Sequence, residues 1–139
     1  MPNRFYLSTR KDRSAQAAVL LASLTSRGWE RTLDWTERNA GGPAGHSETA
    51  LAEIAAVRQA DVLIALLPGG YGTHVEIGAA LALGKPVILH ARDRETLDTP
   101  YPCVFHYHPA VTLLISEVLD VDEVLARMSS VVRARRTLH

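Results

Sequence analysis

Residues 61–90 read DVLIALLPGGYGTHVEIGAALALGKPVILH, and the fold is decided in this stretch. The continuous apolar run at 61–67 is typical of a central parallel strand that is covered on both of its faces. A glycine-bearing turn at 68–73 leads into a helix of small residues, which is expected over about 74–83. A second buried strand is then expected at 85–90. The stretch therefore predicts a strand, a loop, a helix and a parallel strand in succession.

The rest of the chain alternates strands and helices in the same way. Strands are expected at 3–8, 29–35, 103–107 and 110–116, and helices at 14–28, from Ser47 onward and at 120–136. In the helix that begins at Ser47, the apolar face is expected to hold Leu51, Ile54 and Ala55. We interpret residues 1–139 as one domain of the α/β class, with a Rossmann-like (flavodoxin-like) parallel sheet of about five strands flanked by helices.

Composition and net charge limit the kinds of molecule that the protein is expected to bind. The chain of 139 residues is 47% apolar, and its 15 basic and 15 acidic side chains cancel. A neutral chain without a long basic stripe argues against nucleic acid as a partner, and the basic run at 133–136 is expected to be a solvated helix end. No secretion signal or membrane-spanning run is visible. Cys103 is alone, which is compatible with a reducing compartment, so we expect a cytoplasmic protein that binds no membrane.

Three loops follow the carboxyl ends of the first three expected strands, where ligands bind in open parallel sheets. The first holds Ser8, Thr9 and Arg10, the second spans 36–46 and is expected to be mobile, and the third is 68–73. The glycines of the third loop let the backbone turn sharply and approach a ligand, and the helix start after them suits an anion such as phosphate. The spacing is that of neither a Walker A loop nor a dinucleotide-binding loop.

Glu76 has two interpretations. THVE, residues 73–76, fits the capping-box pattern, with Thr73 as the N-cap and Glu76 at the third helical position. A glutamate in the first turn of a helix also lies in a field that favours its ionised form. An ionised and positioned carboxylate is what a nucleophile or a stabiliser of an oxocarbenium ion requires. Local sequence leaves both interpretations open, and they do not exclude each other.

Residues of the quoted stretch match the sequence pattern of a known enzyme family. The matching residues are Asp61, Gly72, Glu76, Ile77, Gly78, Ala80, Gly84, Lys85 and Val87. With these residues the chain resembles the nucleoside 2-deoxyribosyltransferase family, including its branch of 2'-deoxynucleoside 5'-phosphate N-hydrolases. The resemblance covers roughly residues 4–90 and is strongest over 53–90. It implies a single deoxyribosyltransferase-like domain that needs no metal or organic cofactor. It also implies a homodimer or a higher homo-oligomer, with sites that borrow residues from a neighbour.

The resemblance implies roles for individual residues. Glu76 stands where the family has the nucleophile that attacks the anomeric carbon of the sugar. Glu53 replaces the family's Asp, eight residues before Asp61, and either orients the base or donates a proton, or lies on a solvated helix face. Tyr6 either hydrogen-bonds the nucleophile or the sugar, or only packs in its strand. Arg10 is a candidate partner for a 5'-phosphate, and the candidate substrate-binding residues are Ser8, Thr9, Arg10, Pro68, Gly69, Gly70, Gly72 and Thr73.

A second resemblance concerns the loop alone. PGGYGTHVE, residues 68–76, resembles the PGGxGTxxE signature of the cytokinin-activating phosphoribohydrolases, which cleave an N-glycosidic bond in nucleoside 5'-monophosphates. That family has an Arg-Lys pair on the preceding helix, where this chain has Ala52 and Glu53. We therefore place the chain with the deoxyribosyltransferase-like group. Both resemblances imply a domain that breaks a sugar–base bond.

Histidines provide the other candidate sites. His106 and His108 lie two residues apart and would share one face of a strand, as metal ligands can. By spacing, no further Cys, His or acid joins them, so no metal is expected. His74 flanks the expected helix start and His46 lies in the loop at 36–46, where a histidine is more often exposed than in contact with a ligand.

These observations lead to one expected function and two alternatives. The expected protein is an enzyme, a hydrolase or a glycosyltransferase, that acts on the N-glycosidic bond of a nucleoside or nucleoside 5'-monophosphate through Glu76. The alternatives are a non-catalytic nucleotide-binding sensor of the same fold and a structural domain in which THVE only caps a helix. Ribose and 2-deoxyribose, and hydrolysis and base transfer, are equally compatible with the sequence.

Overall fold

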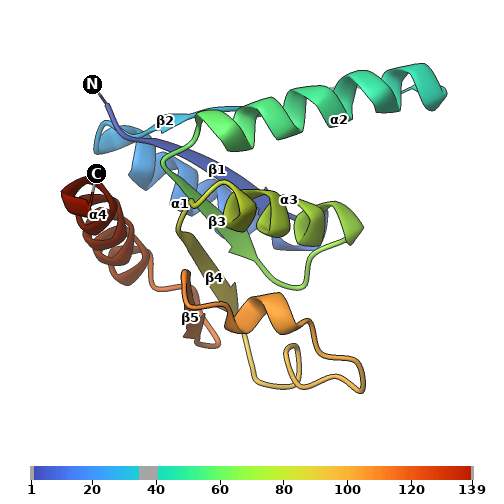
Figure 1. Cartoon of the computed structure of the whole chain (residues 1–139). Helices are drawn as coiled ribbons and strands as arrows, with labels where there is room; N and C mark the ends of the chain where they lie inside the picture. Colours follow the sequence, from blue (N-terminus) through green and yellow to red (C-terminus); the bar gives the residue numbers. More distant parts are fainter. Residues whose placement is uncertain (1, 35–40, 139) are drawn as a thin grey trace.

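A computed structural model describes residues 2–34 and 41–138 and contains a five-stranded parallel sheet (Figure 1). The strands are β1 (Arg4–Thr9), β2 (Glu30–Arg31), β3 (Val62–Leu66), β4 (Val87–Ala91) and β5 (Val111–Ile115). The helices are α1 (Ser14–Ser26), α2 (Gly42–Gln59), α3 (Tyr71–Ala82) and α4 (Val121–Leu138), with the short 3-10 helices η1 (Lys11–Arg13) and η3 (Val104–Tyr107). The strand order, β2-β1-β3-β4-β5, is that of a flavodoxin-like doubly wound sheet.

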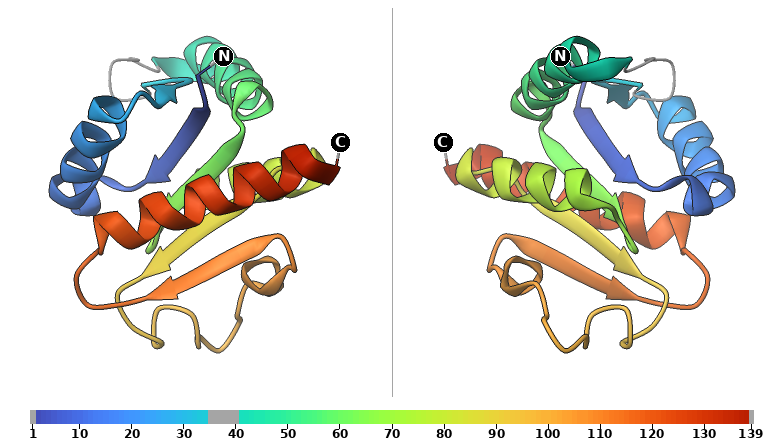
Figure 2. Two further views of the ribbon diagram at one scale, coloured as in Figure 1. Left: turned by 90° about the vertical axis from the view of Figure 1, so that its left-hand side faces the viewer. Right: turned by 90° about the vertical axis from the view of Figure 1, so that its right-hand side faces the viewer.

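Helices cover both faces of the sheet (Figure 2). Along β1 the side chains alternate, so that Phe5 and Leu7 face one side while Tyr6 faces the other. Helices α1 and α4 pack on the side of Phe5 and Leu7, and α2 and α3 pack on the side of Tyr6. Tyr6 therefore points to the same side of the sheet as α3, the helix that carries Glu76.

This layering explains the continuous apolar run of β3. Every residue of Val62–Leu66 is buried, because β3 lies between β1 and β4 and helices cover both of its faces. Strand β4 is buried in the same way. The predicted succession of strand, loop, helix and strand in residues 61–90 is confirmed, with α3 beginning at Tyr71 rather than near His74. The α/β class and the flavodoxin-like sheet are confirmed with it.

Helix α2 begins earlier than predicted. Its first residue is Gly42 rather than one following an N-cap at Ser47, and Gly41 is the N-cap. Pro43 lies in the first turn, where the N–H that proline lacks would have no partner within the helix in any case. The expected loop at 36–46 therefore already contains helix, and residues 35–40 lie outside the described part of the chain.

Helix α2 also buries a different face from the predicted one. Leu51 is 72% exposed and Ala55 is exposed, while Ile54 is only half-buried. The buried residues are Ala56 and Val57. The reason is that α2 extends past the sheet, so its C-terminal part alone lies against the strands (Figure 1). Within the described part of the chain, no helix combines the length and apolar character needed to span a bilayer.

Two predicted strands are corrected. In the described part of 29–35, only β2 forms a strand, because it lies at the edge of the sheet and pairs with β1 alone. The segment at 103–107 forms the 3-10 helix η3 instead of a strand. Pro102 and Pro109 flank this segment, and a proline cannot donate the backbone hydrogen bond that a strand ladder needs.

The turn after β3 is tightly packed at Gly69. A Cβ atom added at Gly69 would lie 2.5 Å from Cβ of Thr73, whereas one added at Gly70 would meet nothing within 4 Å. Protein interiors are too densely packed to absorb such an overlap, so a side chain at position 69 would displace the first turn of α3. The close approach of the Gly69 backbone to the Thr73 side chain thus sets where α3 starts relative to β3.

Replacing Gly69 with alanine tests this contact. We expect Gly69→Ala to lower the free energy of unfolding by about 1–3 kcal/mol, the usual cost of overpacking. Gly70→Ala is the matched control and should change it by less than about 1 kcal/mol. Urea unfolding of both variants beside the unmodified protein measures the difference. Equal stability of the two variants would show that the contact with Thr73 does not constrain the turn.

Candidate active site

A pocket of about 500 Å³ opens at the carboxyl ends of β1 and β3, beside the start of α3. Its size lies within the range of about 300–1,000 Å³ that is usual for small-molecule sites. The structure brings together every predicted site residue except Pro68 and Gly69, which belong to the turn but do not line the pocket. Asp12 also lines it and was not predicted. Among the described residues, the pocket is lined by Tyr6, Ser8, Thr9, Arg10, Asp12, Glu53, Gly70, Gly72, Thr73 and Glu76.

The carboxyl group of Glu76 is held at both of its oxygens. Tyr6 and Ser8 are two residues apart on β1, so both side chains point to the side of the sheet where α3 lies. The hydroxyl of Tyr6 donates to Oε2 of Glu76, and the hydroxyl of Ser8 donates to Oε1 at 2.7 Å. Oγ1 of Thr73 lies 3.0 Å from the same Ser8 oxygen. All four side chains are buried, so the carboxyl group has a fixed position in the pocket.

The capping-box interpretation of THVE is wrong. Helix α3 begins at Tyr71 with Gly70 as its N-cap, and no side chain hydrogen-bonds to the cap. Thr73 is the third residue of the helix and Glu76 the sixth, so neither stands where the capping box requires it. Both side chains instead share a partner on β1, because the hydroxyl of Ser8 lies within hydrogen-bond distance of Thr73 and of Glu76. Tertiary packing of α3 on β1, which local sequence does not report, excludes the capping box, and the catalytic interpretation of Glu76 stays a prediction.

Burial governs the charge of Glu76. It raises the pKa of the carboxyl to about 7; hydrogen bonds from Tyr6 and Ser8 oppose the shift, and the charge of Glu53 adds to it. The expected ionising field of the helix start does not act here, because Glu76 lies beyond the first turn of α3. Burial, together with the Glu76 charge, raises the pKa of Tyr6 above its usual range, so Tyr6 remains a donor. Near neutral pH the pocket therefore holds a mixture of acid and carboxylate.

Glu53 faces the pocket from α2. Its side chain is half-buried, and its charge acts on both Tyr6 and Glu76. The additional methylene of Glu, compared with the Asp of the family pattern, therefore does not keep the carboxyl away from the pocket. The structure places a second acid in the pocket wall, and its role in a reaction stays a prediction.

Arg10 and Asp12 lie at the pocket rim. Nη2 of Arg10 is 3.1 Å from Oδ2 of Asp12, and both side chains are about half exposed. An exposed ion pair of this kind contributes little to stability, so the guanidinium can change partner at small cost. Thr9 turns toward the backbone, where its hydroxyl donates to the carbonyl oxygen of Leu66 at 3.2 Å.

A buried arginine that the sequence analysis missed supports the loop beside the pocket. Arg13 is 1% exposed, and its guanidinium donates to the carbonyl oxygen of Leu67, directly before the glycine-bearing turn. It also lies 2.9 Å from Nδ1 of His90, whose Nε2 is 3.0 Å from the carbonyl oxygen of Ser116. Arg13 thereby connects the carboxyl ends of three neighbouring strands. No local pattern marks it, since it is one of three basic residues in RKDR, residues 10–13.

The hydrogen bonds of this network assign the protonation of His90. Because Arg13 has only donors, Nδ1 of His90 must accept, and Nε2 must then carry the proton that is donated to Ser116. Burial lowers the pKa of His90, and the charge of Arg13 lowers it further. His90 is therefore a neutral link between the arginine and the chain after β5.

The other histidines within residues 2–34 and 41–138 lie outside the pocket lining. His46 is exposed on α2. His106 and His108 do not share a strand face, because η3 replaces the strand: Nδ1 of His108 accepts from the backbone N–H of Ala110 at 2.9 Å. His106 is buried and turns toward His74 instead.

The fold and the site together define an α/β protein that holds a buried carboxyl group at the strand ends of a doubly wound sheet. The chain belongs to the nucleoside 2-deoxyribosyltransferase family, whose model matches residues 5–126. The match extends past the region 4–90 that carried the resemblance, through β5 and into α4. Membership places the protein among enzymes that act on the bond between the sugar and the base of a nucleoside.

Solved structures share the fold. The CMP N-glycosidase BcmB of Clostridium botulinum is 23% identical, covers 91% of this chain and 99% of its own, and has a TM-score of 0.64. A 2-deoxyribosyltransferase from Bacillus psychrosaccharolyticus is 18% identical, with coverages of 90% and 95% and a TM-score of 0.63. Another from Leishmania mexicana is 18% identical, with coverages of 91% and 96% and a TM-score of 0.59. Among curated protein sequences, none matches the chain.

The raised pKa of Glu76 predicts a stability that falls as pH rises. The folded protein keeps this proton up to about pH 7, whereas an unfolded glutamate loses it near 4.5, so the free energy of unfolding decreases across that interval. Glu76→Gln keeps the shape without the charge, and we expect it to be more stable than the unmodified protein by about 1–3 kcal/mol at high pH. Thermal unfolding at pH 8 and at pH 5 measures this gain. A gain that does not shrink toward pH 5 would contradict the raised pKa.

Proposed function

We propose that this protein cleaves the N-glycosidic bond of a nucleoside or nucleoside 5'-monophosphate, with Glu76 as the nucleophile at the anomeric carbon of the sugar. The observation that carries the proposal is the fixing of both Glu76 oxygens by Tyr6 and Ser8 inside the pocket. Membership in the nucleoside 2-deoxyribosyltransferase family supports the class of bond. A carboxylate held in this way is positioned for attack on a sugar lying above it.

The proposed reaction has two steps. First, an oxygen of ionised Glu76 bonds to the anomeric carbon while the carbon–nitrogen bond breaks, and the electron pair of that bond leaves with the base. Tyr6 and Ser8 hold the carboxylate so that the attack requires no search over side-chain rotamers. Second, water or another base attacks the same carbon and frees Glu76. Water gives hydrolysis and a second base gives transfer.

Glu53 is the proposed partner of the leaving base. It lies in the pocket wall on α2, across from the nucleophile on α3, so the two carboxyl groups approach the substrate from different helices. A base leaves more readily when it gains a proton or a hydrogen bond as the bond to the sugar breaks. In the protonated form Glu53 supplies that proton, and in the ionised form it orients the base.

Arg10 is the proposed contact for a 5'-phosphate. Its guanidinium lies at the rim and is paired with Asp12, which it would exchange for the phosphate. The N-terminal end of α3, at Gly70 and Gly72, also borders the pocket and supplies backbone N–H groups that suit an anion. Both features support a nucleoside 5'-monophosphate as substrate beside a plain nucleoside.

A non-catalytic nucleotide sensor is the second candidate function. It is favoured by the pKa of about 7 at Glu76, since a partly protonated carboxyl is a weaker nucleophile than an ordinary carboxylate. Calorimetry combined with product analysis separates the two functions. Tight binding of a nucleotide without any free base after long incubation would identify a sensor.

A homo-oligomer is proposed together with the activity. Large apolar side chains are exposed on α2 and α3, the helices that border the pocket: Leu51 is 72%, Tyr71 95% and Val75 62% exposed. A second copy of the chain would cover such side chains, and the sequence resemblance implies a homodimer or a higher homo-oligomer. The partner of the site itself is a small molecule.

Replacing Glu76 tests the nucleophile. We expect Glu76→Gln to slow base release at least about 1,000-fold, because an amide does not form the ester with the sugar. The protein is incubated with nucleosides and nucleoside 5'-monophosphates, with and without an acceptor base, and free base and exchanged product are separated by chromatography. Glu123→Gln is the matched control, since Glu123 is exposed on α4 at the other face of the sheet. A folded Glu76→Gln variant with full activity would refute the assignment.

The pH profile tests the role of Tyr6. We expect kcat/KM to fall as pH drops through about 7, because Glu76 then takes up the proton that removes its nucleophilic electron pair. The hydrogen bond from Tyr6 lowers the pKa of Glu76, so Tyr6→Phe should move this acid limb to higher pH. The variant therefore loses more activity at pH 6 than at pH 9. An acid limb at the same pH in both proteins would show that Tyr6 does not act on the carboxyl.

A further inference from the structure

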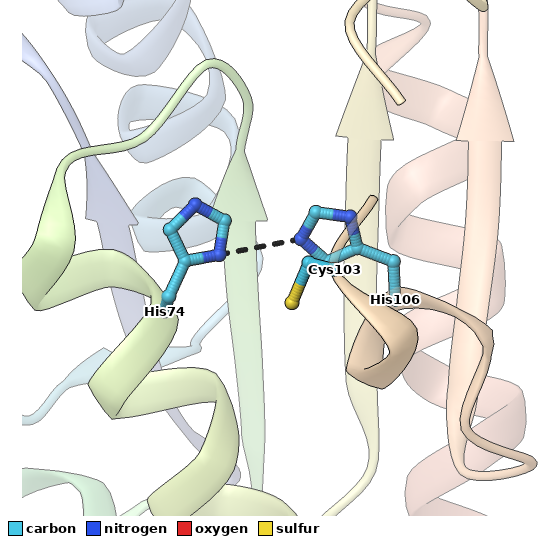
Figure 3. Close-up of side chains that lie close together, drawn as sticks. All are labelled: His74, Cys103 and His106. Atoms are coloured by element: carbon cyan, nitrogen blue, oxygen red, sulfur yellow. Dashed lines mark hydrogen bonds between the residues drawn. The ribbon is translucent and has the colours of Figure 1, made fainter. Parts of the chain in front are cut away.

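Three potential metal ligands meet between α3 and the connection from β4 to β5. They are His74 on α3, Cys103 directly before η3 and His106 within η3 (Figure 3). One ligand atom of each residue lies within 4.8 Å of the others. None of the three lines the pocket that contains Glu76, so the cluster is a separate feature of the molecule.

Local geometry brings the three side chains to one point. Cys103 and His106 are three residues apart in a 3-10 turn, in which such residues eclipse one another, and the backbone N–H of His106 donates to the carbonyl of Cys103 at 3.1 Å. His74 reaches them from the neighbouring helix, as Figure 3 shows. Two residues along a helix turn through about 200°, so His74 points away from the side on which Glu76 meets β1.

The distance between the two rings suits a shared ion. Nδ1 of His74 and Nε2 of His106 are 3.3 Å apart. Two nitrogens that bind a tetrahedral zinc ion at about 2.0–2.1 Å lie about 3.3–3.4 Å from each other. The rings therefore stand at the separation that the ion requires before any ion is placed between them.

A simple hydrogen bond between the rings accounts less well for His106. His106 is only 5% exposed, and its Nδ1 has no hydrogen-bond partner among the described residues. Nδ1 stays unpaired whether Nε2 bonds to His74 or to a metal ion, so the two cases differ only in what Nε2 binds. A metal–nitrogen bond at Nε2 is stronger than that hydrogen bond and offsets more of the cost of burial.

Cys103 determines the class of ion. Its side chain is half-buried beside the rings, and a thiolate with two imidazoles selects zinc-like ions over magnesium or calcium. In a tetrahedral site the sulfur would lie roughly 3.5 Å from each nitrogen. The outer limit of the present spacing, 4.8 Å, exceeds this distance by about 1 Å, so binding requires Cys103 to move toward the rings by at most that amount.

We propose that His74, Cys103 and His106 bind one Zn²⁺ ion, with water as the fourth ligand. On binding, the thiol of Cys103 gives its proton to the solvent and both rings bind as neutral imidazoles, so no oxidant or reductant takes part. The ion joins α3 to the β4–β5 connection. Because the unfolded chain does not hold the three ligands together, binding stabilises the folded protein.

The test uses the full-length protein, reduced and freed of metal with a chelator. Titration with Zn²⁺ should give one ion per chain and a higher melting temperature. Titration with Co²⁺ should give a thiolate-to-cobalt charge-transfer band in addition to the visible bands of a tetrahedral ion, because cobalt takes the place of zinc. Neither readout depends on catalysis, so the outcome is independent of the proposed activity.

Variants identify the ligands. Cys103→Ser should lose the charge-transfer band, and His74→Ala and His106→Ala should weaken Zn²⁺ binding at least about 10-fold. His46→Ala and His108→Ala are matched controls that remove histidines outside the cluster and should bind as the unmodified protein does. Circular dichroism without metal confirms that each variant is folded. Absence of binding by the unmodified protein, or an unchanged cobalt spectrum in Cys103→Ser, would overturn the proposal.

Discussion

The candidate site depends on the burial of one carboxyl group, that of Glu76, against the end of β1. Burial disfavours the charged form, and the hydroxyls of Tyr6 and Ser8 offset part of that cost by donating to both oxygens. The two-residue period of a strand puts both donors on one face. The right-handed crossover between the parallel strands β3 and β4 puts α3 on that same face. The chemistry of the pocket thus follows from the topology of the sheet.

The loop that leads into α3 is held from two directions. On one side Gly69 lies against Thr73 so closely that no side chain fits between them. On the other side the buried guanidinium of Arg13 binds the carbonyl of Leu67 and continues through His90 to the chain after β5. A buried charge is tolerated only when its donors are satisfied, and here the satisfied donors tie three strand ends together. The pocket is therefore supported by a polar network that takes no direct part in it.

The fold was largely predictable from sequence because a parallel sheet imposes continuous apolar strands, which 61–67 displays openly. The family pattern located Glu76, and the structure shows Tyr6 bonded to it. What failed were features that depend on tertiary contacts. THVE fits a cap as well as a site, and only the packing of α3 on β1 excludes the cap. Arg13 carries no local signal at all. In the cluster around His106, His74 precedes Cys103 and His106 by about 30 residues, so only the folded chain brings the three side chains together.

The mixed protonation of Glu76 makes ligand capture a proton-coupled event. Because the pKa of Glu76 is raised to about 7, the pocket holds both the acid and the carboxylate near neutral pH. Under the proposed function, a sugar that develops positive charge at its anomeric carbon favours the carboxylate, so its binding releases protons at that pH. The heat of binding then depends on the ionisation enthalpy of the buffer, and the apparent affinity rises as the solution becomes more alkaline. Substrate capture and the acidity of the surroundings are thereby linked through one buried pair of oxygens.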